Sequence, residues 1–137
     1  MFDFRKVVSF LPRESDAREQ RFAQQLRKGV LEMLVLQLLA EQPGHGYGLI
    51  LQLRQRSSGL LDLKEGTLYP ILYRLEDEGC IVSAWAAPEE TASRGRTAPR
   101  KIYTITPAGR ETLAVQQTVW QEFSACVNHI CGGKHHG

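Results

Sequence analysis

Long apolar runs are missing from this sequence, and with them the marks of a membrane or secreted protein. No stretch approaches the roughly 20 apolar residues that a membrane-spanning helix needs, and no signal-peptide core follows the charged start of the chain. Cysteine is also scarce: the three present are an odd number without the spacing of a disulfide framework. We therefore expect a cytoplasmic protein that does not bind membranes.

A large excess of charge of one sign is missing too. The net charge is only +2, so any binding of nucleic acid would depend on where the basic residues lie. The chain has no nucleophile–base pair, glycine-rich phosphate loop or carboxylate dyad, which argues against an enzyme. The histidines and cysteines near the C-terminus match no tetrahedral metal template, so we expect no metal and no cofactor. These residues are His129, Cys131, His135 and His136.

What the sequence does contain is an amphipathic segment over residues 64–79. On a helix, its apolar residues recur at i, i+3, i+4 and i+7 and form one stripe of Leu68, Ile71, Leu72 and Leu75. The remaining surface carries hydroxyls, phenols, a proline and an arginine, namely Thr67, Tyr69, Pro70, Tyr73 and Arg74. Such side chains suit a DNA groove, because hydroxyls donate to phosphates and Arg reads guanine edges. On composition alone, an ordinary helix packed on a core is the favoured interpretation.

Pro70 limits where this helix can begin. A proline within a helix lacks the donor to the carbonyl four residues back, clashes with that carbonyl, and pushes the preceding residue away from the α region. We therefore expect either a helix that starts near Gly66, with Pro70 close to its first turn, or a helix that is kinked at Pro70.

The flanking segments predict a winged helix-turn-helix, which is a mainly α fold with a small two-stranded β wing. Two apolar helical segments precede the amphipathic one, and two alternating runs that read as strands follow it. Thr106 and Pro107 then form a strong helix start, with Thr as the cap. The expected elements are helices over 30–40, 45–56 and 64–79, strands over 81–85 and 101–105, and a helix from 107 to about 130.

We divide the chain into four parts on these patterns. Residues 1–27 form an N-terminal extension with a short helix from Ser15 or Asp16 to Leu26, which we expect to pack on a dimer; a mobile arm is the alternative. Residues 28–106 form the winged helix-turn-helix, residues 107–131 form a dimerisation helix, and residues 132–137 form a flexible tail.

Four short motifs stand out along the chain. They are Gly29-Val-Leu-Glu-Met-Leu, His45-Gly-Tyr-Gly, Glu65-Gly-Thr-Leu-Tyr-Pro-Ile-Leu-Tyr-Arg-Leu-Glu and Arg100-Lys-Ile-Tyr-Thr-Ile-Thr-Pro-Ala-Gly. In this order they resemble the PadR family of bacterial transcriptional regulators, over about residues 28–130. The resemblance implies a DNA-binding winged-helix protein that dimerises through one C-terminal helix, and Leu-Tyr-Pro is part of the family signature. The wing departs from the family's compact Gly-Arg-Arg-Lys-Tyr run, because residues 97–99 separate the basic side chains.

Candidate DNA-binding residues follow from both lines of reasoning. The groove contacts that we expect come from residues 64–79: Thr67, Tyr69, Pro70, Tyr73 and Arg74. Phosphate contacts are expected from Tyr47, Lys64, Arg94, Arg96 and Lys101. Gly46 and Gly48 would let a phosphate approach the helix backbone or would permit tight helix packing, and the two interpretations are compatible.

The C-terminal helix needs a partner, because its broad apolar face cannot be buried on a small wing. The simplest partner is a second copy in a two-fold dimer. Trp120, Phe123 and Val127 mark this face. In some PadR-like regulators a tryptophan on this helix stacks with planar hydrophobic ligands, which would make Trp120 part of an effector site. That Trp120 simply fills the dimer core is the favoured alternative.

Together these features predict a sequence-specific DNA-binding transcriptional regulator. We expect a homodimeric repressor that binds double-stranded DNA at an inverted-repeat operator and is released by a small planar hydrophobic effector. The alternative is a winged-helix module for protein interaction or redox sensing, through Cys80, Cys126 or Cys131, without strong DNA binding.

Overall fold

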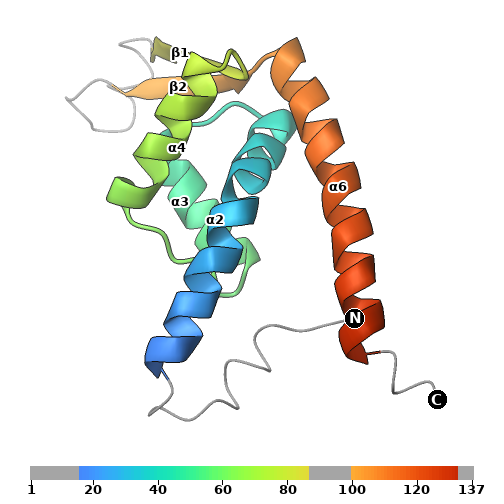
Figure 1. The fold of residues 1–137 in the computed structure, drawn as a ribbon. Helices are drawn as coiled ribbons and strands as arrows, with labels where there is room; N and C mark the ends of the chain where they lie inside the picture. Colours follow the sequence, from blue (N-terminus) through green and yellow to red (C-terminus); the bar gives the residue numbers. More distant parts are fainter. Residues whose placement is uncertain (1–15, 87–99, 133–137) are drawn as a thin grey trace.

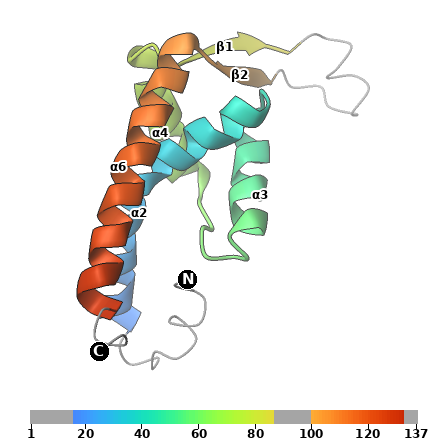
Figure 2. The same ribbon diagram turned by 90° about the vertical axis from the view of Figure 1, so that its right-hand side faces the viewer.

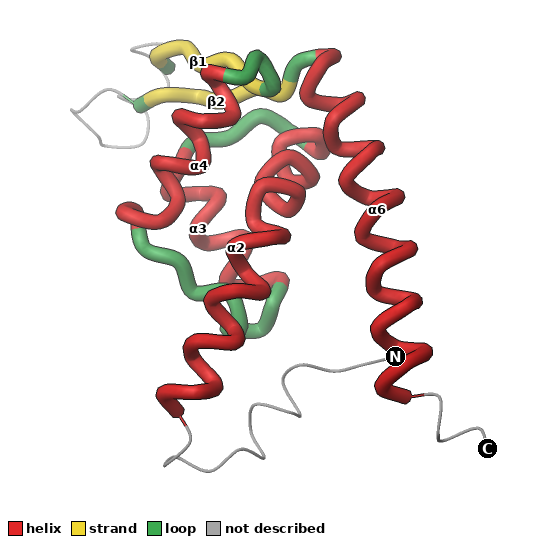
Figure 3. The backbone as a smooth tube through the Cα atoms, in the orientation of Figure 1, coloured by secondary structure: helices red, strands yellow, loops and turns green. Residues whose placement is uncertain are grey.

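The described part of the chain, residues 16–86 and 100–132 of a computed structural model, consists of helices and one two-stranded sheet (Figure 1). In chain order the elements are α2 (Asp16–Glu41), α3 (Gly46–Arg56), α4 (Glu65–Asp77), β1 (Ile81–Trp85), β2 (Lys101–Ile105) and α6 (Pro107–Gly132). Helices α3 and α4 lie on one side of α2, α6 lies on the other, and the β1–β2 ribbon crosses one end (Figures 1 and 3). The predicted mainly α fold with a two-stranded wing is confirmed.

The hydrophobic core lies between the C-terminal half of α2, helices α3 and α4, and the ribbon. The apolar stripe predicted for α4 is buried, with Leu68, Leu72 and Leu75 fully covered. Each such leucine stabilises the fold by about 1.5–3 kcal/mol relative to an exposed one. The other large, fully buried side chains are Val35, Leu36, Leu39, Leu49, Ile81 and Tyr103.

Helix α2 differs from the sequence prediction. We expected a short helix ending near Leu26 and a second one over residues 30–40, but one continuous helix runs from Asp16 to Glu41. Gly29 is exposed within it, and a glycine costs a helix only about 1 kcal/mol, which does not end it without a proline or a cap nearby. The boundary expected after residue 27 therefore falls inside α2. Residues 1–15 lie outside the described part of the chain.

Pro70 lies in the second turn of α4, close to the first of the two arrangements that the sequence allowed. The helix begins at Glu65 and contains Pro70 without ending there. The carbonyl that Pro70 cannot bond belongs to Gly66, which is exposed, so water can satisfy it.

The ribbon is tied to the turn between α2 and α3. Strands β1 and β2 occupy the predicted residues and pair antiparallel, from Ile81 opposite Ile105 to Trp85 opposite Lys101. Gly44 continues this pairing as an isolated bridge, because it exchanges two backbone hydrogen bonds of 2.7 and 3.1 Å with Tyr103. The ribbon is thereby held against the N-terminus of α3.

The start of α6 is fixed by its predicted cap. Thr106 Oγ1 accepts a 3.0 Å hydrogen bond from the Gly109 amide and donates a 2.6 Å hydrogen bond to the Gly79 carbonyl. A Cβ atom at Gly109 would lie 2.1 Å from the Cys80 carbonyl oxygen, so only glycine allows this close approach. The first turn of α6 is thus anchored to the turn between α4 and β1.

Helices α2 and α6, each of 26 residues, run alongside one another (Figure 2). Gln117 on α6 donates a 2.7 Å hydrogen bond to Gln37 on α2, and Leu113 is buried nearby. None of the described helices combines the length and the apolar content that crossing a membrane requires.

Candidate nucleic-acid interface

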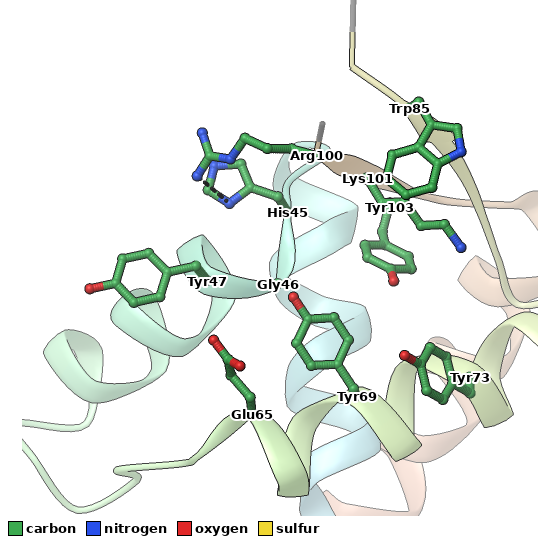
Figure 4. Close-up of a pocket in the computed structure, with 10 residues that line it drawn as sticks. All are labelled: His45, Gly46, Tyr47, Glu65, Tyr69, Tyr73, Trp85, Arg100, Lys101 and Tyr103. Carbon is green, nitrogen blue, oxygen red and sulfur yellow. Dashed lines mark hydrogen bonds between the residues drawn. The ribbon is translucent and has the colours of Figure 1, made fainter. Parts of the chain in front are cut away.

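A cavity of about 610 Å³ opens where the N-terminus of α3, helix α4 and the ribbon meet (Figure 4). Its wall is aromatic and basic, with one carboxylate. The lining residues are His45, Gly46, Tyr47, Glu65, Tyr69, Tyr73, Trp85, Arg100, Lys101 and Tyr103. Of the residues predicted to bind DNA, the structure gathers Tyr47, Tyr69, Tyr73 and Lys101 around this cavity.

The outward face of α4 carries the polar and aromatic residues that the sequence singled out. Lys64 at the N-cap, Thr67 and Pro70 are exposed, and Tyr73 is 56% exposed. The buried stripe lies on the opposite side of the helix. This face is therefore accessible to a groove along its whole length.

Tyr69 differs from its neighbours because it is half-buried against α3. A Cβ atom at Gly46 would lie 2.3 Å from the Tyr69 hydroxyl oxygen, so the absent side chain at Gly46 makes room for the phenol. This supports helix packing as the role of Gly46. Burial, and then the nearby charge of Glu65, raises the pKa of Tyr69.

Arg74 has an intramolecular partner that the sequence did not predict. Its guanidinium forms an ion pair with the carboxylate of Glu32 on α2, although the Arg74 side chain stays half-exposed. The two residues are 42 positions apart, and no local pattern connects them. A base contact by Arg74 would require this ion pair to open.

His45 joins the wing to α3. Its Nδ1 atom accepts a 3.2 Å hydrogen bond from the Gly48 amide, which caps α3, and Arg100 Nη2 lies 3.2 Å from the same atom. A protonated Nδ1 could not accept either bond, so this arrangement places the ring proton on Nε2. Sequence reasoning used His45 and Arg100 only as parts of motifs and missed this contact.

The base of the wing carries an aromatic–cation pair. Lys101 Nζ lies 5.4 Å from the centroid of the Trp85 ring, on the outermost residue pair of the ribbon. Arg94 and Arg96, which we predicted to bind phosphates, lie outside the described residues. Of the predicted phosphate contacts, the structure therefore describes Tyr47, Lys64 and Lys101, all of which reach the surface.

Comparison with known proteins identifies the family of this chain. The model of the PadR-like family of transcriptional regulators matches residues 35–115, which is more than half of the chain. The chain belongs to this family. It is 30% identical over 112 residues to the transcriptional regulator Rv3488 from Mycobacterium tuberculosis, which covers 82% of this chain and 92% of that relative.

Solved structures of PadR-family proteins share the fold. A PadR family transcriptional regulator from Eggerthella lenta is 28% identical with a TM-score of 0.72, covering 88% of this chain and 97% of the other. A PadR-like transcription factor from Bacteroides fragilis is 32% identical with a TM-score of 0.63, covering 80% and 98%. As a PadR-family member, the protein is a DNA-binding transcriptional regulator with a winged helix, and not an enzyme.

The second notable surface of this PadR-family protein lies on α6. Trp120 and Val127 are each 39% exposed and Phe123 is 62% exposed. Three more residues extend this apolar face along the helix, namely Val115, Val119 and Ile130. Together these six residues are called the α6 apolar face below.

Cysteines and metal ligands give no further site in the described residues. Cys80 is buried, with its Sγ atom 3.7 Å from Thr112 Oγ1, while Cys126 and Cys131 are exposed and no disulfide joins them. No group of three candidate metal ligands lies together in residues 16–86 and 100–132. His135 and His136 lie outside this range.

Proposed function

We propose that two copies of this protein pair through α6 and repress transcription by binding an inverted-repeat operator. In this proposal each copy places α4 in one of two successive major grooves, about 34 Å apart. The observation that carries the proposal is the division of α4, whose apolar stripe is fully committed to the core while its hydroxyl- and phenol-bearing face remains exposed.

The contacts divide into groove and backbone roles. Thr67, Pro70 and Tyr73 lie on the exposed face of α4 and are suited to base edges and thymine methyl groups. Tyr69 is half-buried and offers less surface to the groove than these three residues. Backbone phosphates would be held by Tyr47, Lys64 and Lys101, together with Arg94 and Arg96 in the wing.

Arg74 is expected to contribute less to operator binding than Tyr73. Its ion pair with Glu32 is partly exposed, and such pairs contribute little net stability, about 0–1 kcal/mol, so DNA could displace it. Arg74→Ala is then expected to weaken operator binding less than loss of the Tyr73 side chain.

The α6 apolar face supports the dimer. Six large apolar side chains exposed along one helix exceed what a monomeric surface leaves scattered, and contiguous patches of this kind mark interaction sites. A second copy related by two-fold symmetry presents the same face and can cover it. Trp120 at this interface would fill the dimer core or stack with a planar hydrophobic effector that releases the operator.

Fluorescence anisotropy of labelled DNA from upstream of the protein's own gene tests the proposal. Compared with a scrambled duplex at two salt concentrations, the native duplex should bind more tightly at both, while both affinities fall with salt. Tyr73→Ala and Thr67→Ala should each reduce the preference for the native duplex. Thr118→Ala, on the exposed part of α6, is the matched control and should not. Equal binding of both duplexes would overturn sequence-specific recognition.

A further inference from the structure

Tyr103 directs its hydroxyl into the cavity between α3, α4 and the ribbon. The residue is only 2% exposed, yet its side chain lines the cavity, and in Figure 4 its ring extends from β2 toward α4. No residue in the described ranges forms a hydrogen bond with this hydroxyl, which reaches the cavity and is not among the buried polar atoms without a partner, so a molecule in the cavity can bond to it. Burial raises the pKa of Tyr103 to about 12, so the hydroxyl remains a donor at neutral pH.

The walls around this hydroxyl suit a flat ring. The Tyr69 and Tyr73 rings lie 6.1 Å apart at 41° to one another, and the 64% exposed Trp85 faces the same space from the ribbon. Aromatic side chains in offset or tilted arrangements stack with planar groups, and the energy does not depend on the exact ring. These rings offer a surface on which one planar heteroaromatic group can stack.

The charged side chains around the cavity lie at separate places (Figure 4). Arg100 turns toward His45 at the N-terminus of α3, whereas Lys101 turns toward Trp85. Lys101 forms no ion pair with any residue that the structure describes. Glu65 lies on the α3 side, away from Lys101, where it would repel an anion and accept a hydrogen bond from a ring amino group.

We propose that this cavity binds a free nucleotide, with the phosphate at Lys101 and the base against the rings of the tyrosines and Trp85. A lysine ammonium binds a phosphate through charge-assisted hydrogen bonds. The Tyr103 hydroxyl donates to the bound nucleotide. The site contains no residue of α6 and is separate from the dimer face.

A nucleotide in this cavity would compete with DNA. Tyr47, Tyr73 and Lys101 line the cavity and also belong to the surface proposed to bind the operator. This competition rests on the proposed function, but the binding of the nucleotide does not. The two can therefore fail independently.

Tryptophan fluorescence measures nucleotide binding directly. The chain has two tryptophans, so Trp120→Phe leaves Trp85 as the only reporter, beside the cavity. Titration of this variant with AMP should give saturable quenching. Adenosine and ribose 5-phosphate, which each lack one half of the ligand, should bind at least about tenfold more weakly. Absence of saturable quenching by AMP would overturn the proposal, and so would equal binding of ribose 5-phosphate.

A matched pair of lysine variants and one tyrosine variant, all in the same background, locate the site. Lys101→Gln and Lys64→Gln each remove one positive charge, but Lys64 does not line the cavity. Lys101→Gln should weaken AMP binding about tenfold and Lys64→Gln less than about twofold, since a charge-assisted hydrogen bond is lost only in the first. Tyr103→Phe, which keeps the ring, should also weaken AMP binding several-fold, because the hydroxyl donor is lost. Equal effects of the two lysine variants would mean general charge attraction and contradict the site.

The same AMP concentrations are then added to the protein–operator complex. Release of the labelled duplex, with Lys101→Gln less sensitive to AMP, supports competition on one surface. If AMP binds to the protein but the labelled duplex is not released, AMP and DNA do not compete for one surface. Saturable AMP binding by a protein that binds no duplex would support the nucleotide site and overturn the proposed function.

Discussion

Helices α4 and α6 are both amphipathic, but only α4 covers its apolar face within one chain. Leu68, Leu72 and Leu75 of α4 are fully buried, whereas Val119, Phe123 and Ile130 of α6 are 57%, 62% and 74% exposed. The surface that α4 leaves to solvent is polar and aromatic, and the surface that α6 leaves is apolar. The difference indicates two kinds of partner, a nucleic acid for α4 and a second protein chain for α6.

The largest effect on stability is expected from a substitution in the buried apolar stripe of α4. Leu72→Ala removes a fully buried side chain of α4 and should lower the free energy of unfolding by about 2–5 kcal/mol. Urea denaturation at fixed protein concentration measures this loss. Thr67→Ala, on the exposed face of the same helix, should change it by less than about 0.5 kcal/mol. A loss below about 1 kcal/mol for Leu72→Ala would contradict the packing described for α4.

A charged residue introduced into the α6 apolar face tests whether this face forms the dimer interface. Phe123→Glu places a carboxylate in the α6 apolar face and should convert the dimer to a monomer, because an unpaired charge is costly to bury in an interface. Sedimentation velocity measures the change, and far-UV circular dichroism should still report a helical protein. Thr118→Glu, on an exposed residue of the same helix, is the control and should remain dimeric. A dimeric Phe123→Glu variant would assign the interface elsewhere.

A smaller effect is expected where α4 meets α3. Gly46→Ala forces the Tyr69 ring to move and should cost about 1–3 kcal/mol by thermal or urea unfolding. Gly66→Ala is the matched glycine, since no atom lies within 4 Å of its added Cβ, and it should stabilise α4 by about 0.5–1 kcal/mol. Equal effects at both positions would show that the Tyr69 contact does not constrain Gly46.

The smallest effect is a dependence of stability on alkaline pH. Burial raises the pKa of Tyr103 from 10.0 to about 12, so the folded state favours the neutral phenol. This contribution is fully present below about pH 10, the pKa in the unfolded chain, and is lost as the pH rises toward 12. Urea midpoints measured across this range should fall more steeply for the natural protein than for Tyr103→Phe. Tyr47→Phe, at an exposed position, should keep the steep fall.

Local patterns were sufficient to predict α4, both strands and the cap of α6. The i, i+3, i+4 stripe, the alternation in residues 81–85 and 101–105, and the Thr-Pro start depend on neighbours in the sequence. The continuity of α2 was missed because the polar residues before Leu26 and the apolar residues from Val30 read as two separate helices, although no proline or cap separates them.

The missed features of the candidate site are contacts between distant residues. Arg74 binds Glu32, Arg100 lies against His45, and Tyr69 fills the space that Gly46 leaves. Each pair is joined only by tertiary packing, and a single sequence contains no signal for it. The Arg100-Lys-Ile-Tyr motif did mark the residues of β2 that line the cavity, although it gave no indication that a cavity exists.

The central claim is that α6 pairs two chains so that two α4 helices bind one operator. Once the operator is located by footprinting, anisotropy titrations compare a full inverted repeat with a single half-site, using the natural protein and Phe123→Glu. The natural protein should bind the full site far more tightly than the half-site, and Phe123→Glu should bind both equally weakly. Equal binding of the two duplexes by the natural protein would contradict pairing through α6.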